Sequence, residues 1–163
     1  MAEIDNDVAA DVTDVQREEE IRVCLFSIGE DTYAIPIELL TEIIIPQIVF
    51  PVPTTPPHVL GVINLRGNIV PIVDIRPALS LPPQSAIGQI AIVKYGTITL
   101  GVVVDHVFDV VSVPESSVLM IPADHGVQAV RNRSRFFKGI IQREAGLAAL
   151  LNVERLFEEI KLT

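Results

Sequence analysis

The chain of 163 residues has no tryptophan, one cysteine and only 5% aromatic residues. A single cysteine, Cys24, cannot form an internal disulfide, which is typical of a reducing compartment. Because 49% of the residues are hydrophobic and so few are aromatic, the core must be aliphatic. Valine and isoleucine fit the pleated surface of a strand better than a helix. We therefore expect a mainly β protein.

Long apolar runs are also missing. Proline, glycine or a charged residue interrupts every stretch before it reaches the roughly 18 residues of a membrane-spanning helix. The N-terminus does not show a basic segment followed by an apolar one, the pattern of a secretory signal. We expect a cytoplasmic protein with no direct membrane insertion.

An excess of positive charge is absent too, because the formal net charge is −9. Residues 1–20 hold eight acids and one arginine, a charge of −7, so the other 13 acids and 11 bases leave −2 for the remaining chain. A nearly neutral body does not attract a polyanion through its overall field. We interpret residues 1–19 as a disordered acidic leader, because they offer little apolar surface to offset the cost of ordering, and residues 20–163 as the folded domain.

The motifs of common enzymes are not found. The chain has no phosphate-binding glycine loop, nucleophile elbow or dinucleotide fingerprint. His58, His106 and His125 do not have the spacing of metal ligands, and Cys24 is expected as a small buried side chain among apolar neighbours. We expect a protein without catalytic residues, metal or cofactor.

The chain does contain an internal repeat in two parts. Residues 61–79 recur in outline 78 positions later, and residues 29–43 recur 67 positions later. Matched pairs include Gly61 with Gly139, Asp74 with Asn152, Gly29 with Gly96, Glu42 with Asp109, and Ile43 with Val110. Each copy supplies two apolar strand pairs with a short polar connection, about enough chain to close a small barrel. We expect two similar barrels with a seam between them.

The pattern of apolar residues and turn residues predicts where the strands lie. Strands are expected at residues 21–28, 32–35, 41–49, 60–65, 69–74, 87–95, 97–104, 107–113, 137–143 and 147–151, with a short extended piece near residues 127–130. In the turn at residues 66–68, Gly67 and Asn68 are expected to supply positive φ angles. Asp74 and Asn152 are expected to cap short helices, the second extending through Ile160.

The segment Asn64-Leu65-Arg66-Gly67 and the residues Ile-Val-Pro-Ile-Val-Asp that end at Asp74 resemble the signature of the CheW family. Members of this family are coupling proteins of bacterial chemotaxis-type signalling arrays. Residues 33–42, 101–105 and 139–151 are similar to the family as well, so the resemblance covers about residues 21–160. It implies two SH3-like five-stranded β-barrels packed together, with short helices, and an adaptor role without catalysis.

The resemblance also implies two protein partners. One is the cytoplasmic tip of a methyl-accepting chemoreceptor, a helical hairpin that lies in the groove between the barrels. The other is the regulatory domain of a CheA-type histidine kinase, which has the same double-barrel fold and docks on barrel ends. The protein would then be recruited to membrane-associated receptor arrays, in swimming chemotaxis or in a pilus-driven or phototactic pathway.

Eight residues match family positions at the receptor groove: Leu40, Glu42, Ile43, Gly61, Ile63, Arg66, Val107 and Val110. By this resemblance Arg66 and Glu42 lie close together as a charged rim, although a lone solvated charge is the ordinary interpretation of either. The apolar members suit a trough for an amphipathic helix, or else plain barrel core. Gly61 either admits a partner backbone or marks a bulge.

A nucleic-acid-binding β-barrel is the alternative function. It would use a basic and aromatic cluster made of Arg131, Arg133, Arg135, Phe136, Phe137 and Lys138. The near-neutral body and the scarcity of aromatic residues argue against this alternative. We expect no nucleic-acid partner.

Overall fold

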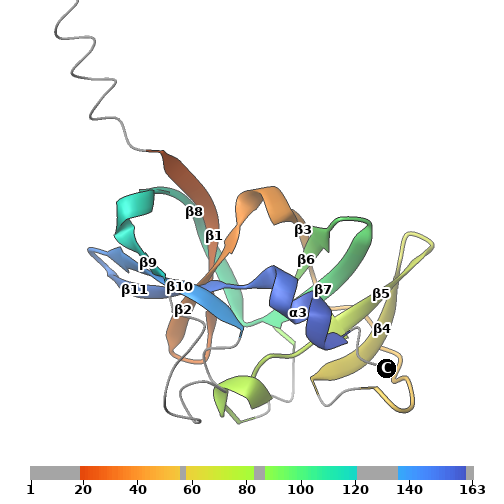
Figure 1. Ribbon diagram of the computed structural model, residues 1–163. Coiled ribbons are helices and arrows are strands. Elements are labelled where there is room, and N and C mark those ends of the chain that lie inside the picture. The colour runs from red at the N-terminus through yellow and green to blue at the C-terminus, as the bar shows by residue number, and fades with distance from the viewer. Residues whose placement is uncertain (1–18, 56–57, 83–86, 121–135, 161–163) are drawn as a thin grey trace, which may run out of the picture.

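The structure is a computed structural model that describes residues 19–55, 58–82, 87–120 and 136–160 (Figure 1). Nearly all of the expected acidic leader lies outside the described residues. The extended piece expected near residues 127–130 lies outside them as well.

Two sheets make up the molecule, and the expected mainly β fold is confirmed (Figure 1). The six-stranded sheet, called sheet A here, has the order β8-β1-β2-β11-β10-β9. Its strands are β1 (Glu20–Ile28), β2 (Asp31–Pro36), β8 (His106–Pro114), β9 (Val118–Met120), β10 (Phe137–Arg143) and β11 (Gly146–Leu151). The five-stranded sheet, called sheet B, has the order β3-β6-β7-β5-β4. Its strands are β3 (Leu40–Ile44), β4 (Val59–Leu65), β5 (Asn68–Val73), β6 (Gln89–Tyr95) and β7 (Ile98–Val104).

Short helices join the strands. Three 3-10 helices are η1 (Ile37–Leu39), η2 (Pro77–Leu79) and η3 (Glu115–Ser117), and the α-helix α3 spans Val153–Ile160. The backbone N–H of Arg155 donates to Oδ1 of Asn152 at 3.0 Å, which is the expected cap of α3. The N–H of Arg76 donates to Oδ1 of Asp74 at 2.9 Å just before η2. The capping prediction for Asn152 is therefore confirmed, whereas Asp74 does not cap η2, because the N-cap of this helix is Arg76 and has no side-chain cap hydrogen bond.

The two sheets share one topology, so the repeat is real. In pairing order, β8, β1, β2, β11 and β10 of sheet A match β3, β6, β7, β5 and β4 of sheet B. The bounds of β4 and β10 differ by 78 at both ends, as do those of β5 and β11. The β-bulges repeat as well, because the register shifts between Val59 and Gly61 in one hairpin and between Phe137 and Gly139 in the other. A single bridge between Phe50 and Val62 takes the place that β9 has in sheet A.

Neither sheet, however, comes from one copy of the repeat. Strand β3 follows the β1–β2 hairpin of sheet A but pairs with β6 in sheet B. Strand β8 follows the β6–β7 hairpin of sheet B but pairs with β1 in sheet A. One barrel per copy, the simplest interpretation of the repeat, is therefore wrong. The two copies exchange strands across the seam.

The length of the connections explains the exchange. Strand β8 runs parallel to β2, because both strands pair with β1 in an antiparallel way. For β3 to take the place of β8 beside β1, the chain would first have to return to the end of the sheet at which β2 begins. Such a crossover needs a dozen or more residues. Only the three residues of η1 separate β2 from β3, and only Asp105 separates β7 from β8. Each strand therefore continues into the opposite sheet.

An aliphatic core lies between the sheets and holds them together. Its buried members come from both sheets and from α3: Phe26, Ile28, Tyr33, Ile35, Val73, Ile75, Ala91, Val93, Leu100, Val102, Val104, Phe136, Leu151, Val153, Leu156 and Phe157. Tyr33 stacks between Phe26 and Phe137, with ring centroids 5.9 and 5.4 Å apart. A smaller apolar cluster fills each sheet separately.

Two local predictions are wrong. The turn between β4 and β5 takes its positive φ angles at Arg66 (49°) and Gly67 (88°), while Asn68 already belongs to β5. A two-residue hairpin turn of type I′ demands positive φ at both central residues, and the Asn64 side chain supports this turn by accepting the Gly67 N–H at 2.8 Å. Extended structure is also expected over residues 41–49 with an interruption at Pro46. Strand β3 does end at Ile44, two residues before this proline, which has no N–H to donate, but the strand does not resume at residues 47–49.

Replacing Gly61 by alanine should destabilise the fold strongly. Gly61 has a φ of 151°, and an added Cβ would lie 2.2 Å from the carbonyl oxygen of Phe50. Gly146 has a similar φ of 132° with no atom within 4 Å of the added Cβ, so Gly146→Ala is a matched control for backbone strain alone. In urea denaturation we expect a loss of at least about 2 kcal/mol for Gly61→Ala and about 1 kcal/mol for Gly146→Ala. Equal losses would show that the contact with Phe50 yields easily.

Candidate binding surface at the junction of the two sheets

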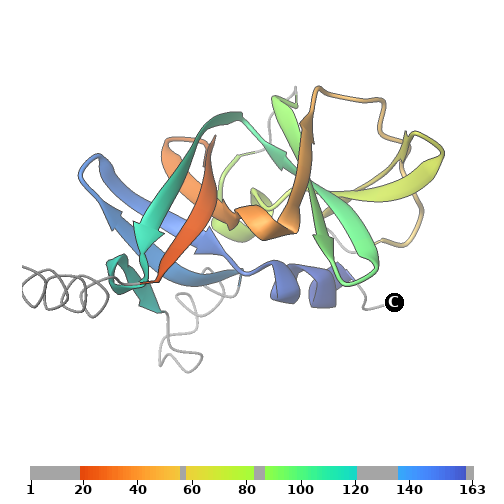
Figure 2. The same ribbon diagram turned by 90° about the horizontal axis from the view of Figure 1, so that it is seen from above.

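Five of the eight predicted groove residues lie on the two exchanged strands. Leu40, Glu42 and Ile43 belong to β3, and Val107 and Val110 belong to β8. In Figure 2 the short helix η1, drawn in orange, leads into β3 at the centre of the molecule, between the two groups of strands. The predicted residues therefore gather where the chain crosses from one sheet to the other.

The apolar members form two pairs that the repeat relates. Leu40 and Val107 are equivalent positions, and both are half-buried against the core between the sheets. Ile43 and Val110 are the second pair, in which Ile43 is half-buried and Val110 is exposed. The N–H of Val107 donates to the Gln89 side chain of β6 at 2.7 Å, so a hydrogen bond links β8 to the strand with which β3 pairs. These residues combine core packing with surface that a partner can reach.

Glu42 and Arg66 form an ion pair, as the resemblance implied. The two residues come from β3 and from the tip of the β4–β5 hairpin, and β3 and β4 are the two end strands of sheet B. The pair therefore joins the two ends of that sheet. With 67% of the Arg66 side chain and 33% of the Glu42 side chain exposed, the pair contributes little to stability and is available to a partner.

Gly61 and Ile63 do not lie on this surface. Ile63 is fully buried in the apolar cluster of sheet B, in agreement with the core alternative. Gly61 is buried at the β-bulge, and the backbone that approaches it is the chain's own Phe50, in agreement with the bulge alternative. Both residues support the hairpin that carries Arg66.

The cysteine of the chain is poorly suited to nucleophilic chemistry. Burial and the nearby carboxylate of Asp109 raise the pKa of the Cys24 thiol, so that it is a poor nucleophile at neutral pH. Among the described residues, no three potential metal ligands lie close together. In the same part of the chain, no helix is both long and apolar enough to cross a membrane.

The basic and aromatic cluster of the nucleic-acid alternative is only partly visible. Arg131, Arg133 and Arg135 lie outside the described residues. Phe136 is fully buried, and Phe137 is half-buried in its stack on Tyr33. The two rings are committed to the core and do not offer a stacking platform for bases.

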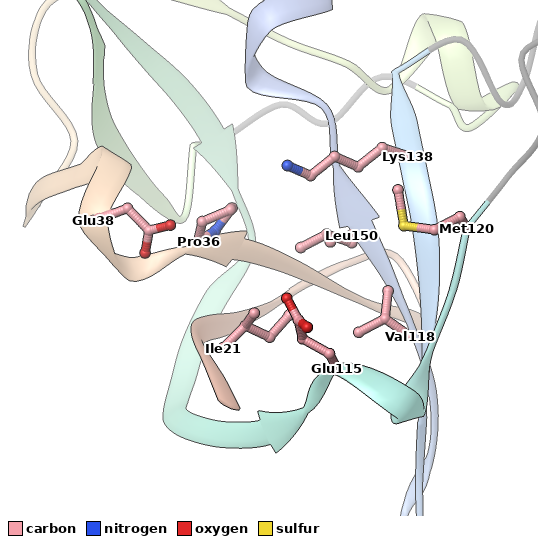
Figure 3. Close-up of a pocket in the computed structure, with 8 residues that line it drawn as sticks. All are labelled: Ile21, Pro36, Glu38, Glu115, Val118, Met120, Lys138 and Leu150. Carbon is pink, nitrogen blue, oxygen red and sulfur yellow. The ribbon is translucent and has the colours of Figure 1, made fainter. Parts of the chain in front are cut away.

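A cavity of about 410 Å³ opens in sheet A, and sequence reasoning missed it (Figure 3). Its lining comes from strands β1, β2, β11, β10 and β9 and from η1 and η3, and it consists of Ile21, Pro36, Glu38, Glu115, Val118, Met120, Lys138 and Leu150. None of the eight predicted groove residues is among them. The residues lie on five strands and two 3-10 helices, and no local pattern connects them in the sequence.

Sequence reasoning also missed a second ion pair, between Arg76 and Asp105. In the repeat Asp105 lies 67 positions after Glu38, and nothing in the sequence links Asp105 to Arg76. In contrast to the exposed pair, this one is mostly hidden from solvent, with 5% and 21% of the side chains exposed.

Two pseudo-equivalent sheets, an exposed apolar junction and a charged rim describe a protein-binding module. Comparison with known proteins shows which one. The family model for the CheW-like domain matches residues 22–161, and the chain belongs to the CheW family. The assignment made from the sequence is confirmed, and the comparisons do not support the nucleic-acid alternative.

Relatives across the bacteria align over most of the chain. The chemotaxis protein CheW of Bacillus subtilis is 30% identical over 140 residues, covering 85% of this chain and 87% of that protein. The chemotaxis protein CheW of Helicobacter pylori is 28% identical over 144 residues, covering 87% and 84%. The crystal structure of a scaffolding protein CheW from Thermoanaerobacter tengcongensis has a TM-score of 0.71 at 24% identity, covering 82% of this chain and 90% of that one. The last likeness supports the fold.

Removing the exposed ion pair should leave the fold intact. For Arg66→Ala we expect a loss of less than about 1 kcal/mol in the free energy of unfolding, because both groups remain hydrated when the partner is removed. A double-mutant cycle with Glu42→Gln, followed by urea denaturation, should give a coupling of about 0.2–1 kcal/mol. Loss of the β-sheet circular dichroism signal in Arg66→Ala would make Arg66 a structural residue.

Proposed function

We propose that this protein is a non-catalytic adaptor that couples chemoreceptors to a CheA-type histidine kinase in a bacterial chemosensory array. It acts in the cytoplasm and is recruited to arrays of membrane-bound receptors. The pathway is one of chemotaxis or of a related motility system, in line with relatives that include chemotaxis proteins and the protein FrzA of Myxococcus xanthus, which is 26% identical over 138 residues.

The position of the exchanged strands carries this proposal. Strands β3 and β8 bring Leu40, Ile43, Val107 and Val110 to the junction of the sheets, and the ion pair of Glu42 with Arg66 lies beside β3. Apolar side chains next to a charged rim are the surface on which an amphipathic helix packs. A receptor tip built as a helical hairpin presents such a face, and an arginine at the rim can bind a carboxylate of the receptor.

For the kinase, we propose contacts at the ends of the sheets. Phe50 and Leu119 occupy matching places in the repeat, at the outer edge of sheet B and of sheet A, and both are exposed large hydrophobic residues. A kinase domain with the same double-barrel fold offers two equivalent edges of its own. Docking edge to edge leaves the junction free for the receptor.

Receptor binding should depend on Val110. A pull-down with the purified chain from the native cell should recover a histidine kinase and a receptor with a long helical hairpin. Val110→Arg places a charge where the apolar face of the hairpin packs, so we expect it to weaken receptor binding at least about tenfold and to retain the kinase. Leu147→Arg is the matched control, because Leu147 is an exposed aliphatic residue at the far hairpin of sheet A and should not matter.

Two results would contradict the adaptor assignment. One is recovery of neither protein by the wild-type chain. The other is equal loss of the receptor with Val110→Arg and Leu147→Arg, which would show that binding responds to added charge in general and not to the junction.

Assembly of all three proteins should require Arg66. The side chain lies at the rim, and its fork can bind a carboxylate with two parallel hydrogen bonds. We expect Arg66→Ala to reduce the amount of kinase that sediments with receptor-bearing membranes about tenfold or more, and Arg66→Lys to restore only part of it. Full assembly with Arg66→Ala would remove Arg66 from the binding surface.

A further inference from the structure

The buried pair of Arg76 and Asp105 joins three segments that are distant in the sequence. Arg76 precedes η2 after the last strand of the β4–β5 hairpin in sheet B. Asp105 is the single residue between β7 and β8, where the chain leaves sheet B for sheet A. The β1–β2 hairpin of sheet A is the third segment, since the Gly29 N–H donates to Oδ2 of Asp105 at 2.7 Å.

Further hydrogen bonds surround the pair. The Arg76 guanidinium binds Oδ1 of Asp105, and the Asp105 N–H donates to the carbonyl oxygen of Ser27 at 2.9 Å. The Arg76 carbonyl accepts the N–H groups of Leu79 and Leu81, both at 3.0 Å. An ion pair withdrawn from solvent needs good geometry and additional hydrogen bonds of this kind, which restrict the arrangements that it tolerates.

The aliphatic core between the sheets lacks this directionality. Apolar contacts depend on the area buried and tolerate small sliding and repacking of the surfaces. A core made mostly of valine, isoleucine and leucine, with four aromatic side chains, therefore holds the sheets together with less directional preference than hydrogen bonds impose. Hydrogen bonds and an ion pair between the sheets can make that choice.

The repeat shows that the pair is not needed to build a sheet. At the positions equivalent to Asp105 and Arg76, the other half of the molecule has Glu38 and Glu154, two exposed acids that cannot attract each other. Its strands nevertheless have the same order and the same bulges. The ion pair is present in one half of the repeat only, which indicates that it acts on the placement of the two sheets and not on the formation of either one.

We propose that Arg76 and Asp105 are a positioning pair that sets the orientation of the two sheets, and with it the shape of the receptor groove. The link to the groove is short, because Val107 and Val110 follow Asp105 by two and five residues on β8. This inference rests on the proposed receptor binding, whereas the orientation itself is a property of the isolated chain. The two parts are therefore tested separately.

Pulsed electron paramagnetic resonance measures the orientation. Spin labels are attached to Ile69→Cys and Leu147→Cys in a Cys24→Ala background, because these two residues occupy equivalent places in sheets B and A and are 66% and 63% exposed. The test variant combines Arg76→Met with Asp105→Leu, since apolar replacement of a buried pair usually preserves folding. The control combines Arg66→Met with Glu42→Leu, which removes the exposed pair in the same way.

We expect one narrow distance distribution in the labelled parent and in the control. In the test variant the mean should shift by more than about 2 Å, or the width should grow about twofold. The single variant Asp105→Asn keeps the shape of the side chain but leaves Arg76 without its ionic partner, and it should show the same change if it folds. Identical distributions in the test variant and the control would overturn the positioning role.

Receptor affinity tests the second part. In the test variant without labels, binding to the receptor hairpin should fall about tenfold while the kinase is retained. A changed distance distribution with unchanged receptor affinity would overturn the link to the groove. If the parent chain itself binds no receptor, the proposed function fails, and the distance measurement still decides whether the pair orients the sheets.

Discussion

The short connections after β2 and β7 are the constraint on which the architecture depends. Three residues and one residue are too few for the next strand to return along its own hairpin, so each strand crosses into the opposite sheet. Neither sheet is complete without a strand from the other copy of the repeat. The sheets must therefore fold and unfold together. The same crossing brings β3 and β8 to the junction, where a partner helix can lie.

Two kinds of interaction divide the work at the seam. The apolar cluster between the sheets supplies most of the free energy that holds the two sheets together, because sixteen buried side chains leave water together. The buried pair of Arg76 and Asp105 supplies direction, because its hydrogen bonds are satisfied in one arrangement. The exposed pair of Arg66 and Glu42 lies outside this division, since solvent screens it and a partner can reach it.

Much of the fold followed from local patterns. The repeat of glycine, aliphatic and capping residues predicted two similar units. Strands β4 and β10 do begin and end at equivalent positions of the repeat, as do β5 and β11. The pairing of Arg66 with Glu42 followed from resemblance to a family. The burial of Ile63 could not be predicted, because the sequence pattern of a strand is the same whether an isoleucine faces the core or a partner. The exchange of strands was missed because the repeat shows which segments are alike and not which ones pair.

The sequence by itself determined that the chain forms strands, where most of them begin and end, and which family it belongs to. These properties depend on side-chain shape, turn chemistry and residue order, all of which act over a few neighbouring positions. The tertiary structure alone decided that the chain crosses between the sheets before β3 and before β8, that Gly61 is covered by Phe50, and that Asp105 meets Arg76. Such contacts join residues far apart in the chain, and only the packing of both sheets around one core brings them together.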